Sequence, residues 1–187
     1  MAKRKMSLKP YMTPAETAMF ARYRDKSFSY FEFGCGGSTI FCDSPTRKIK
    51  SIDNNKEWLD KIRPLVNKTT ELIYCDTCPV LEYGNPADAT KTAGFANYSL
   101  AFEQRYADTD LVLVDGRFRV ACALQVVLSG FTGPVLIHDA QRTEYQPLFP
   151  FFTVTERVEN LIAFRVNPLL DKKDATILWE IYKNIHK

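Results

Sequence analysis

The chain has 187 residues, 45% of them hydrophobic and 25% charged, a composition typical of one ordinary globular domain. The net charge of +3 is too small to indicate a nucleic-acid partner. No apolar run approaches the roughly 18 residues of a membrane span. We therefore expect a small-molecule partner and neither nucleic acid nor membrane, while the oligomeric state stays open.

The N-terminal residues 1–12 indicate a flexible basic tail, and residues 13–187 indicate a single domain. The tail has four basic residues but lacks the apolar core of a secretory signal. The five cysteines lie at strand ends or in apolar segments, which favours reduced thiols and a cytoplasmic protein. Cys75-x-x-Cys78 lacks both the further ligands of a zinc site and the helix start of a redox pair.

Helix and strand patterns alternate along the chain, as in a doubly wound α/β sheet. The first helix, at 14–25, is predicted by a capping box with proline at its first position (Thr13-Pro14-Ala15-Glu16). Further helices are expected near 38–43, 55–64, 96–106, 117–128 and 174–185. Strands are expected at 29–33, 49–53, 71–75, 111–114 and 134–138. An irregular stretch at 79–95, rich in turn formers, is expected to cover the site.

Two further apolar segments, at 152–158 and 161–166, are separated by only two residues. A crossover helix cannot fit between them, so they must form an antiparallel hairpin. These segments bring the predicted sheet to seven strands, of which the last runs in the opposite direction.

The most informative stretch is the glycine-rich turn after the first strand. The turn follows Glu32, and Asp53 ends the second strand nineteen residues after Gly34. Glycines let a ligand approach the backbone, and an acid at this spacing can accept hydrogen bonds from ribose hydroxyls. The pattern predicts a nucleoside-binding crevice at the carboxyl edge of a parallel sheet. The turn consists of Gly34, Cys35, Gly36, Gly37 and Ser38.

The pattern differs from a dinucleotide fingerprint, because Thr39 stands where the third glycine would be. The acid-x-G-x-G-G-S form instead resembles the first motif of class I S-adenosylmethionine-dependent methyltransferases. The resemblance spans most of the chain, from residue 14 to about 166. It implies a Rossmann-like seven-stranded sheet whose last strand is antiparallel, and S-adenosylmethionine as the cofactor.

The resemblance also implies roles for individual residues. The glycine turn would pass under the methionine part of the cofactor, and Asp53, backed by Asn54, would hold the ribose. Asp76 and Thr77, after the third strand, would face the adenine ring. Glu32 would orient the turn or reach the amino group of the cofactor.

On the acceptor side, Asp115 and Arg117 follow the fourth strand, and His138 and Asp139 follow the apolar run of the fifth. Burying unpaired charge there would be costly, so these groups need partners. The V-D-G and H-D strand ends distantly resemble those of catechol-type O-methyltransferases, whose acids hold a divalent cation beside the acceptor hydroxyl. Here Ala140 replaces the amide that follows the second acid in that family. A metal is therefore possible but not favoured.

An acceptor hydroxyl would need a base, for which His138 is the first candidate and Asp115 and Asp139 are the others. Arg117, Arg119 and Arg142 could neutralise the acids or bind an acidic acceptor. We predict that Asp115, His138 and Asp139 line one pocket bordered by Arg117. Of the consecutive pair, Asp139 is expected to face the cofactor if the fifth strand ends at His138.

The resulting hypothesis is S-adenosylmethionine-dependent methyl transfer to a hydroxyl or acidic oxygen of a small acceptor. Two alternatives remain: a small NAD-dependent oxidoreductase and a non-catalytic nucleoside-binding protein on the same scaffold. No second substrate domain or catalytic Tyr-x-x-x-Lys pair supports the oxidoreductase.

Overall fold

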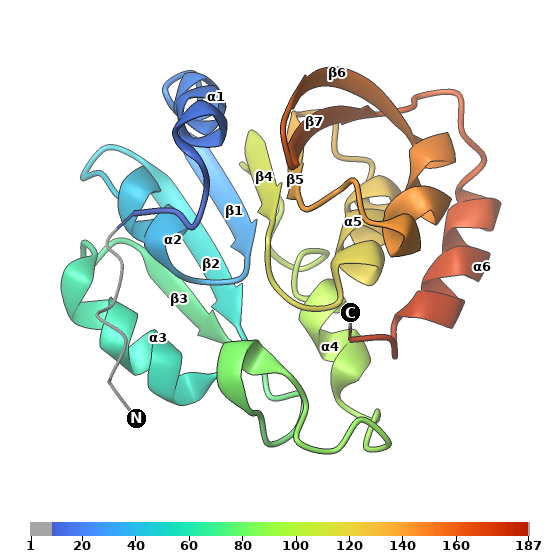
Figure 1. Cartoon of the computed structure of the whole chain (residues 1–187), viewed down its shortest axis with the longest axis horizontal. Coiled ribbons are helices and arrows are strands. Elements are labelled where there is room, and N and C mark those ends of the chain that lie inside the picture. Colours follow the sequence, from blue (N-terminus) through green and yellow to red (C-terminus); the bar gives the residue numbers. More distant parts are fainter. Residues whose placement is uncertain (1–8, 187) are drawn as a thin grey trace.

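A seven-stranded sheet forms the centre of the molecule in the computed structural model, which describes residues 9–186 (Figure 1). The strands are β1 (Ser29–Phe33), β2 (Lys48–Asp53), β3 (Glu71–Tyr74), β4 (Leu111–Val114), β5 (Val135–His138), β6 (Phe152–Val158) and β7 (Leu161–Val166). The α-helices are α1 (Pro14–Arg24), α2 (Gly37–Cys42), α3 (Lys56–Ile62), α4 (Phe95–Leu100), α5 (Arg119–Ser129) and α6 (Lys172–Tyr182). The 3-10 segments are η1 (Arg63–Leu65), η2 (Glu82–Gly84) and η3 (Thr143–Phe151).

The strand order is β3-β2-β1-β4-β5-β7-β6. Strands β1 to β5 all run in the same direction, and β7 is antiparallel to both β5 and β6. The predicted sheet with a reversed last strand is therefore confirmed. Because β1 to β5 point the same way, their carboxyl ends meet at one edge, where the predicted functional residues lie.

The outer strand β6 is irregular. Its register with β7 shifts between Val154 and Glu156, which marks a β-bulge. At the bulge, the Thr155 hydroxyl donates a hydrogen bond to the Ala163 carbonyl over 3.2 Å. An ion pair links Glu156 to Arg22 of α1, so this helix, which packs on one face of the sheet, also contacts β6.

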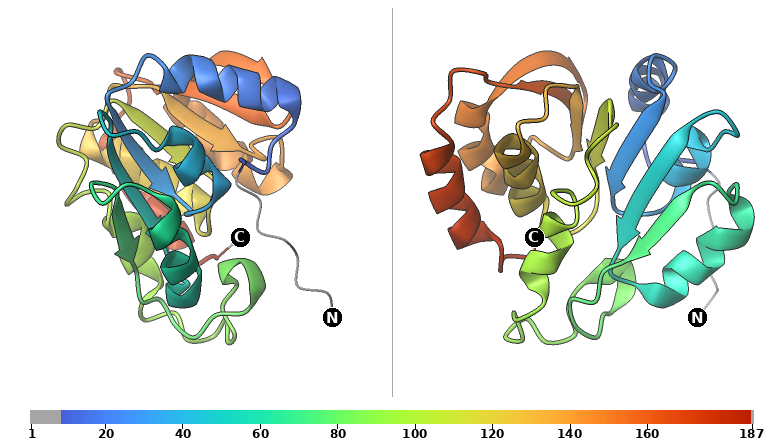
Figure 2. Two further views of the ribbon diagram at one scale, coloured as in Figure 1. Left: turned by 90° about the vertical axis from the view of Figure 1, so that its left-hand side faces the viewer. Right: turned by 180° about the vertical axis from the view of Figure 1, so that it is seen from behind.

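Helices cover both faces of the sheet. The buried strand β4 shows the division, because Val112 and Val114 pack into the cluster that contains α4, α5 and α6, whereas Leu111 and Leu113 pack into the cluster that contains α1 and α2. In the left view of Figure 2, α1, α2 and α3 lie in front of the sheet. The result is a three-layer α/β/α arrangement. Within residues 9–186 no helix is both long and apolar enough to cross a membrane.

Helix α1 begins as its sequence predicts. The Thr13 hydroxyl accepts a hydrogen bond from the Glu16 amide at 3.2 Å, and the Glu16 carboxylate accepts one from the Thr13 amide at 2.8 Å. Residues 1–8 of the predicted basic tail lie outside the described residues. Within the rest of that tail, Pro10 is buried, so the chain packs against the domain before α1 begins.

Several helix bounds differ from the expected ranges by a few residues, and those of α4 and α5 have an identifiable cause. Helix α4 ends at Leu100, and the chain then proceeds through four-residue turns that place Phe102 against Phe31 and Phe33. Helix α5 begins at Arg119 because Phe118 adopts a left-handed conformation, with φ 56°. That turn separates Arg117 from the helix and leaves it in the loop at the carboxyl edge.

Candidate functional site

The glycine turn has one open side. Gly34 has φ +101°, and a Cβ there would lie 2.6 Å from the Gly116 Cα, so the turns after β1 and β4 are in backbone contact. A Cβ at Gly37 would lie 2.0 Å from the carbonyl oxygen of Lys9. A Cβ at Gly36 would have nothing within 4 Å. A ligand can therefore approach the backbone of the turn at Gly36.

Glu32 lies beneath this turn and is fully buried. Its carboxylate accepts hydrogen bonds from the hydroxyls of Ser38, Thr39 and, at 2.9 Å, Ser51. Burial raises the pKa of Glu32 to about 7, although the three hydroxyl donors oppose the shift. Glu32 thus ties β1, β2 and the start of α2 together and orients the turn.

Asp53 lies at the carboxyl end of β2, beside the turn. Its carboxylate accepts hydrogen bonds from the backbone amides of Cys35 at 3.2 Å and Asn55 at 2.8 Å. Burial raises the pKa of this carboxyl to about 6, against the opposing effect of these amides and of the charge on Arg117. The two amides fix the carboxylate beside the glycine turn.

Asn54 and Thr77 hold a covering segment. The Asn54 side-chain amide donates to the Thr77 hydroxyl at 3.1 Å and to the Gly84 carbonyl at 2.9 Å. The irregular segment expected at 79–95 therefore reaches the ends of β2 and β3. Asn54 and Thr77 are both buried, whereas the side chain of Asp76 is exposed.

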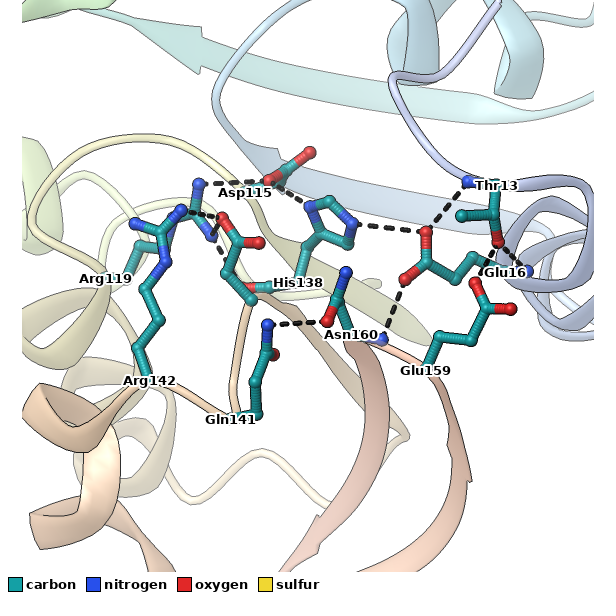
Figure 3. Close-up of polar contacts among 10 residues, drawn as sticks. Thr13, Glu16, Asp115, Arg119, His138, Gln141, Arg142, Glu159 and Asn160 are labelled. Atoms are coloured by element: carbon teal, nitrogen blue, oxygen red, sulfur yellow. Dashed lines mark hydrogen bonds and ion pairs between the residues drawn. The ribbon is translucent and has the colours of Figure 1, made fainter.

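His138 lies between two carboxylates, as Figure 3 shows. Its Nδ1 is 3.1 Å from Asp115 Oδ1, and its Nε2 is 3.5 Å from Glu16 Oε2. The second distance is long for a hydrogen bond, so charge attraction dominates that contact. Desolvation lowers the pKa of His138, but Asp115, Asp139 and Glu16 outweigh it and the net shift is upward. Because both ring nitrogens face carboxylates, neither is directed at a ligand.

Arg119 bridges Asp115 and Asp139, and Figure 3 shows it beside Asp115. Its Nη2 is 3.2 Å from Asp115 Oδ1, and its Nη1 is 3.1 Å from Asp139 Oδ2. Asp139 follows the last residue of β5 in a left-handed conformation, with φ 60°, and also contacts Arg142. Arg119 is only 6% exposed, so two carboxylates compensate a buried charge.

The structure therefore brings Asp115, His138 and Asp139 together at one edge. In the catechol-type arrangement a cation would lie between the two acids, and here the Arg119 guanidinium contacts both. Among residues 9–186, no group of three or more His, Cys, Asp or Glu side chains is arranged to hold a metal ion.

Arg117 borders the same region. Its Nη1 donates to the side-chain oxygen of Asn85 at 2.9 Å. Burial lowers the pKa of Arg117, and the positive charges of Arg119 and Arg142 add to the effect. A cavity of about 250 Å³ lies alongside, lined by Gly116, Arg117, Arg119, Arg142, Glu144 and Tyr145.

Three residues of the site were not assigned to it from sequence. Glu16 was interpreted only as part of a capping box, and Asn85 and Tyr145 were not singled out. Glu16 also accepts a hydrogen bond from the Asn160 amide in the β6–β7 turn, at 2.8 Å. That contact brings the start of α1 to the end of β5, and no local pattern in the sequence signals it.

The chain matches no protein-family profile and no curated protein sequence. Among solved structures, it is similar to a methyltransferase-like protein from Silicibacter pomeroyi DSS-3. The TM-score is 0.84 at 24% identity, over 95% of this chain and 99% of that one. Together with the order and directions of the strands, this similarity establishes the α/β fold of class I methyltransferases.

Proposed function

We propose that this protein transfers a methyl group from S-adenosylmethionine to an oxygen atom of a small acceptor. The observation that carries the proposal is the position of Asp53, held by two backbone amides beside the open side of the glycine turn. In open α/β sheets, ligands bind outside the carboxyl ends of the strands. The fold supports the same reading, since the similar solved structure is described as methyltransferase-like.

The residues present fit this cofactor. Gly36 leaves room for close approach, the Asp53 carboxylate can accept hydrogen bonds from ribose hydroxyls, and the exposed Asp76 would face the adenine ring. When bound, the cofactor supplies an electrophilic methyl group on a sulfonium. The chain's own contribution is to position the acceptor in line with that group and to remove a proton where the acceptor is a hydroxyl.

Asp115 is the base that the geometry favours. Its Oδ1 is held by Arg119 and His138, while no hydrogen bond to Oδ2 is present within residues 9–186. We assign to Oδ2 the role of taking the acceptor's proton. His138 and Glu16 would position Asp115 from behind, and Asp139 would position Arg119 and Arg142. This assignment replaces His138 as the direct base, because its ring nitrogens face carboxylates.

Calorimetry with S-adenosylhomocysteine tests the cofactor site. A hydrogen bond to a charged group contributes about 1.5–3 kcal/mol, so Asp53→Ala should weaken binding at least tenfold. Asp60→Ala, which removes an exposed acid from α3, is the matched control and should leave the affinity unchanged. Equal affinity in Asp53→Ala would refute the proposal. Tighter binding of NAD than of S-adenosylmethionine by the parent protein would favour an oxidoreductase.

Turnover is tested separately, by following S-adenosylhomocysteine release across a panel of hydroxylated and acidic small molecules. Activity that is lost in Asp115→Asn while cofactor affinity is retained would support a hydroxyl acceptor and Asp115 as its base. Retained activity in that variant would contradict the role of Asp115 and favour an acceptor that is already ionised. Cofactor binding without turnover on any acceptor would favour a non-catalytic nucleoside-binding protein.

A further inference from the structure

The three arginines around the 250 Å³ cavity are compensated unequally. Arg119 contacts two carboxylates, and Arg142 contacts one of the same two, that of Asp139. Within residues 9–186, Arg117 forms no ion pair with a carboxylate. Glu144 also lines the cavity, but it is exposed and forms no ion pair with these arginines in the described chain.

Arg117 has the properties of an anion ligand. Its guanidinium is half-buried and its hydrogen bond goes to the neutral amide of Asn85. The Arg117 guanidinium has five N–H donors, and its charge acts on the buried Asp53 carboxylate, but within residues 9–186 no carboxylate lies at ion-pair distance from it. Partial burial without a directly paired counter-charge is unfavourable. The nearby positive charges of Arg119 and Arg142 increase that cost. An anion in the cavity would relieve both effects.

The cavity adjoins the glycine turn, where the cofactor is proposed to bind. Gly116 lines it, and the Gly116 backbone is packed against Gly34 of the glycine turn. A group held by Arg117 therefore lies next to the place proposed for the methyl donor. The volume is slightly below the usual range of small-molecule pockets, about 300–1,000 Å³, and suits one polar end of a small acceptor.

We infer that the cavity bordered by Arg117, Arg119 and Arg142 binds an oxyanion of the methyl acceptor, a carboxylate or phosphate distinct from the methylated oxygen. Arginine is suited to this role because its planar fork of donors matches the oxygens of both anions. Tyr145, which lies near Arg117 and Arg119, adds a hydroxyl to the lining. The inference rests on the proposed function for the acceptor's reaction, but the binding of an anion can be measured without turnover.

The test uses the full chain with benzoate and phenyl phosphate as anionic probes and benzamide as a neutral match for benzoate. Binding is followed by NMR shift changes, with and without S-adenosylhomocysteine. Arg117→Gln should weaken anion binding about tenfold or more, since it removes a charge-assisted contact. Arg142→Gln alters a half-exposed side chain and should weaken it in the same direction. The exposed Arg63→Gln is the control and should have no effect.

Three outcomes would overturn the inference. The first is benzamide binding as tightly as benzoate. The second is unchanged anion binding in both Arg117→Gln and Arg142→Gln. The third is an Arg117→Gln variant that loses affinity for S-adenosylhomocysteine but not for the anions, which would place this arginine at the cofactor. Failure of the parent to bind S-adenosylhomocysteine would instead count against the proposed function, while the anion measurements made without it would still decide this inference.

Discussion

Glu16 links the N-terminal helix to the acceptor side, and replacing it with glutamine is an informative perturbation. The side chain is 1% exposed. Its Oε2 accepts from the Thr13 amide at 2.8 Å and faces His138 at 3.5 Å, while its Oε1 accepts from the Asn160 amide at 2.8 Å. Glutamine preserves the shape but offers one oxygen and one NH2 group. In either orientation, the NH2 group faces a backbone N–H donor.

The expected loss of stability follows from that mismatch. A buried donor without an acceptor costs about 1–3 kcal/mol. For a domain of this size, each 1 kcal/mol lowers the melting temperature by about 2–4 °C, so a loss near 2 kcal/mol corresponds to about 4–8 °C. Removing the negative charge should also lower the pKa of His138, which Glu16 helps to raise.

The pH dependence has a definite sign. The folded pKa of His138 lies above its unfolded value near 6.5, so its contribution to stability is fully present below pH 6.5 and is lost as the pH rises through the folded value. The pKa of Glu16 is lowered on balance, although burial opposes the shift, so its contribution is present above pH 4.5 and is lost as the pH falls through its folded value. The loss of stability caused by Glu16→Gln should therefore be largest at about pH 5–6.5 and smaller well above the folded pKa of His138.

Thermal denaturation followed by circular dichroism measures this loss of stability, and NMR titration measures the pKa of His138. The chain has two histidines, so His186→Gln assigns the two imidazole signals. Glu57→Gln, an exposed glutamate in the first turn of α3, is the matched control. A Glu16→Gln variant within 0.5 kcal/mol of that control, or one with an unchanged His138 pKa, would refute the reasoning.

Two further predictions concern the cofactor crevice. Because burial raises the pKa of Asp53 to about 6 and the ionised form is the better acceptor, affinity for S-adenosylhomocysteine should fall below about pH 6, by up to tenfold per pH unit. Calorimetry between pH 5 and 8 checks this, and a flat profile in the parent would contradict it. Gly37→Ala should lower stability by about 1–3 kcal/mol, because its Cβ would meet the Lys9 carbonyl at 2.0 Å. Gly36→Ala should leave the melting temperature unchanged and weaken cofactor binding. Thermal denaturation and calorimetry of both variants test this, and a Gly36→Ala variant that loses stability but keeps its cofactor affinity would contradict it.

Much of the fold could be predicted because its signals are local. Apolar runs ending in glycine or an acid located β1 to β5, and the short separation of 152–158 and 161–166 required a hairpin. The starts and ends of helices were less predictable. Phe118 adopts a left-handed conformation without the glycine or asparagine that would signal it, so the start of α5 lies two residues later than expected.

The site was predictable as a set of strand ends but not as a set of contacts. Strand direction alone brings Asp115, His138 and Asp139 to one edge. The side chains they contact depend on tertiary structure, since Glu16 reaches His138 only because α1 packs beside the β6–β7 turn. Arg119 is four residues after Asp115, and the turn between them brings its guanidinium back to that carboxylate.

The irregularity of β6 has a consequence for association between molecules. A long outer strand offers another chain a row of backbone donors and acceptors, and flat strands of this kind promote aggregation. In β6 the bulge between Val154 and Glu156 breaks that row, and Glu156 and Arg157 place charges beside the break. A second copy therefore finds no continuous template for strand pairing along β6.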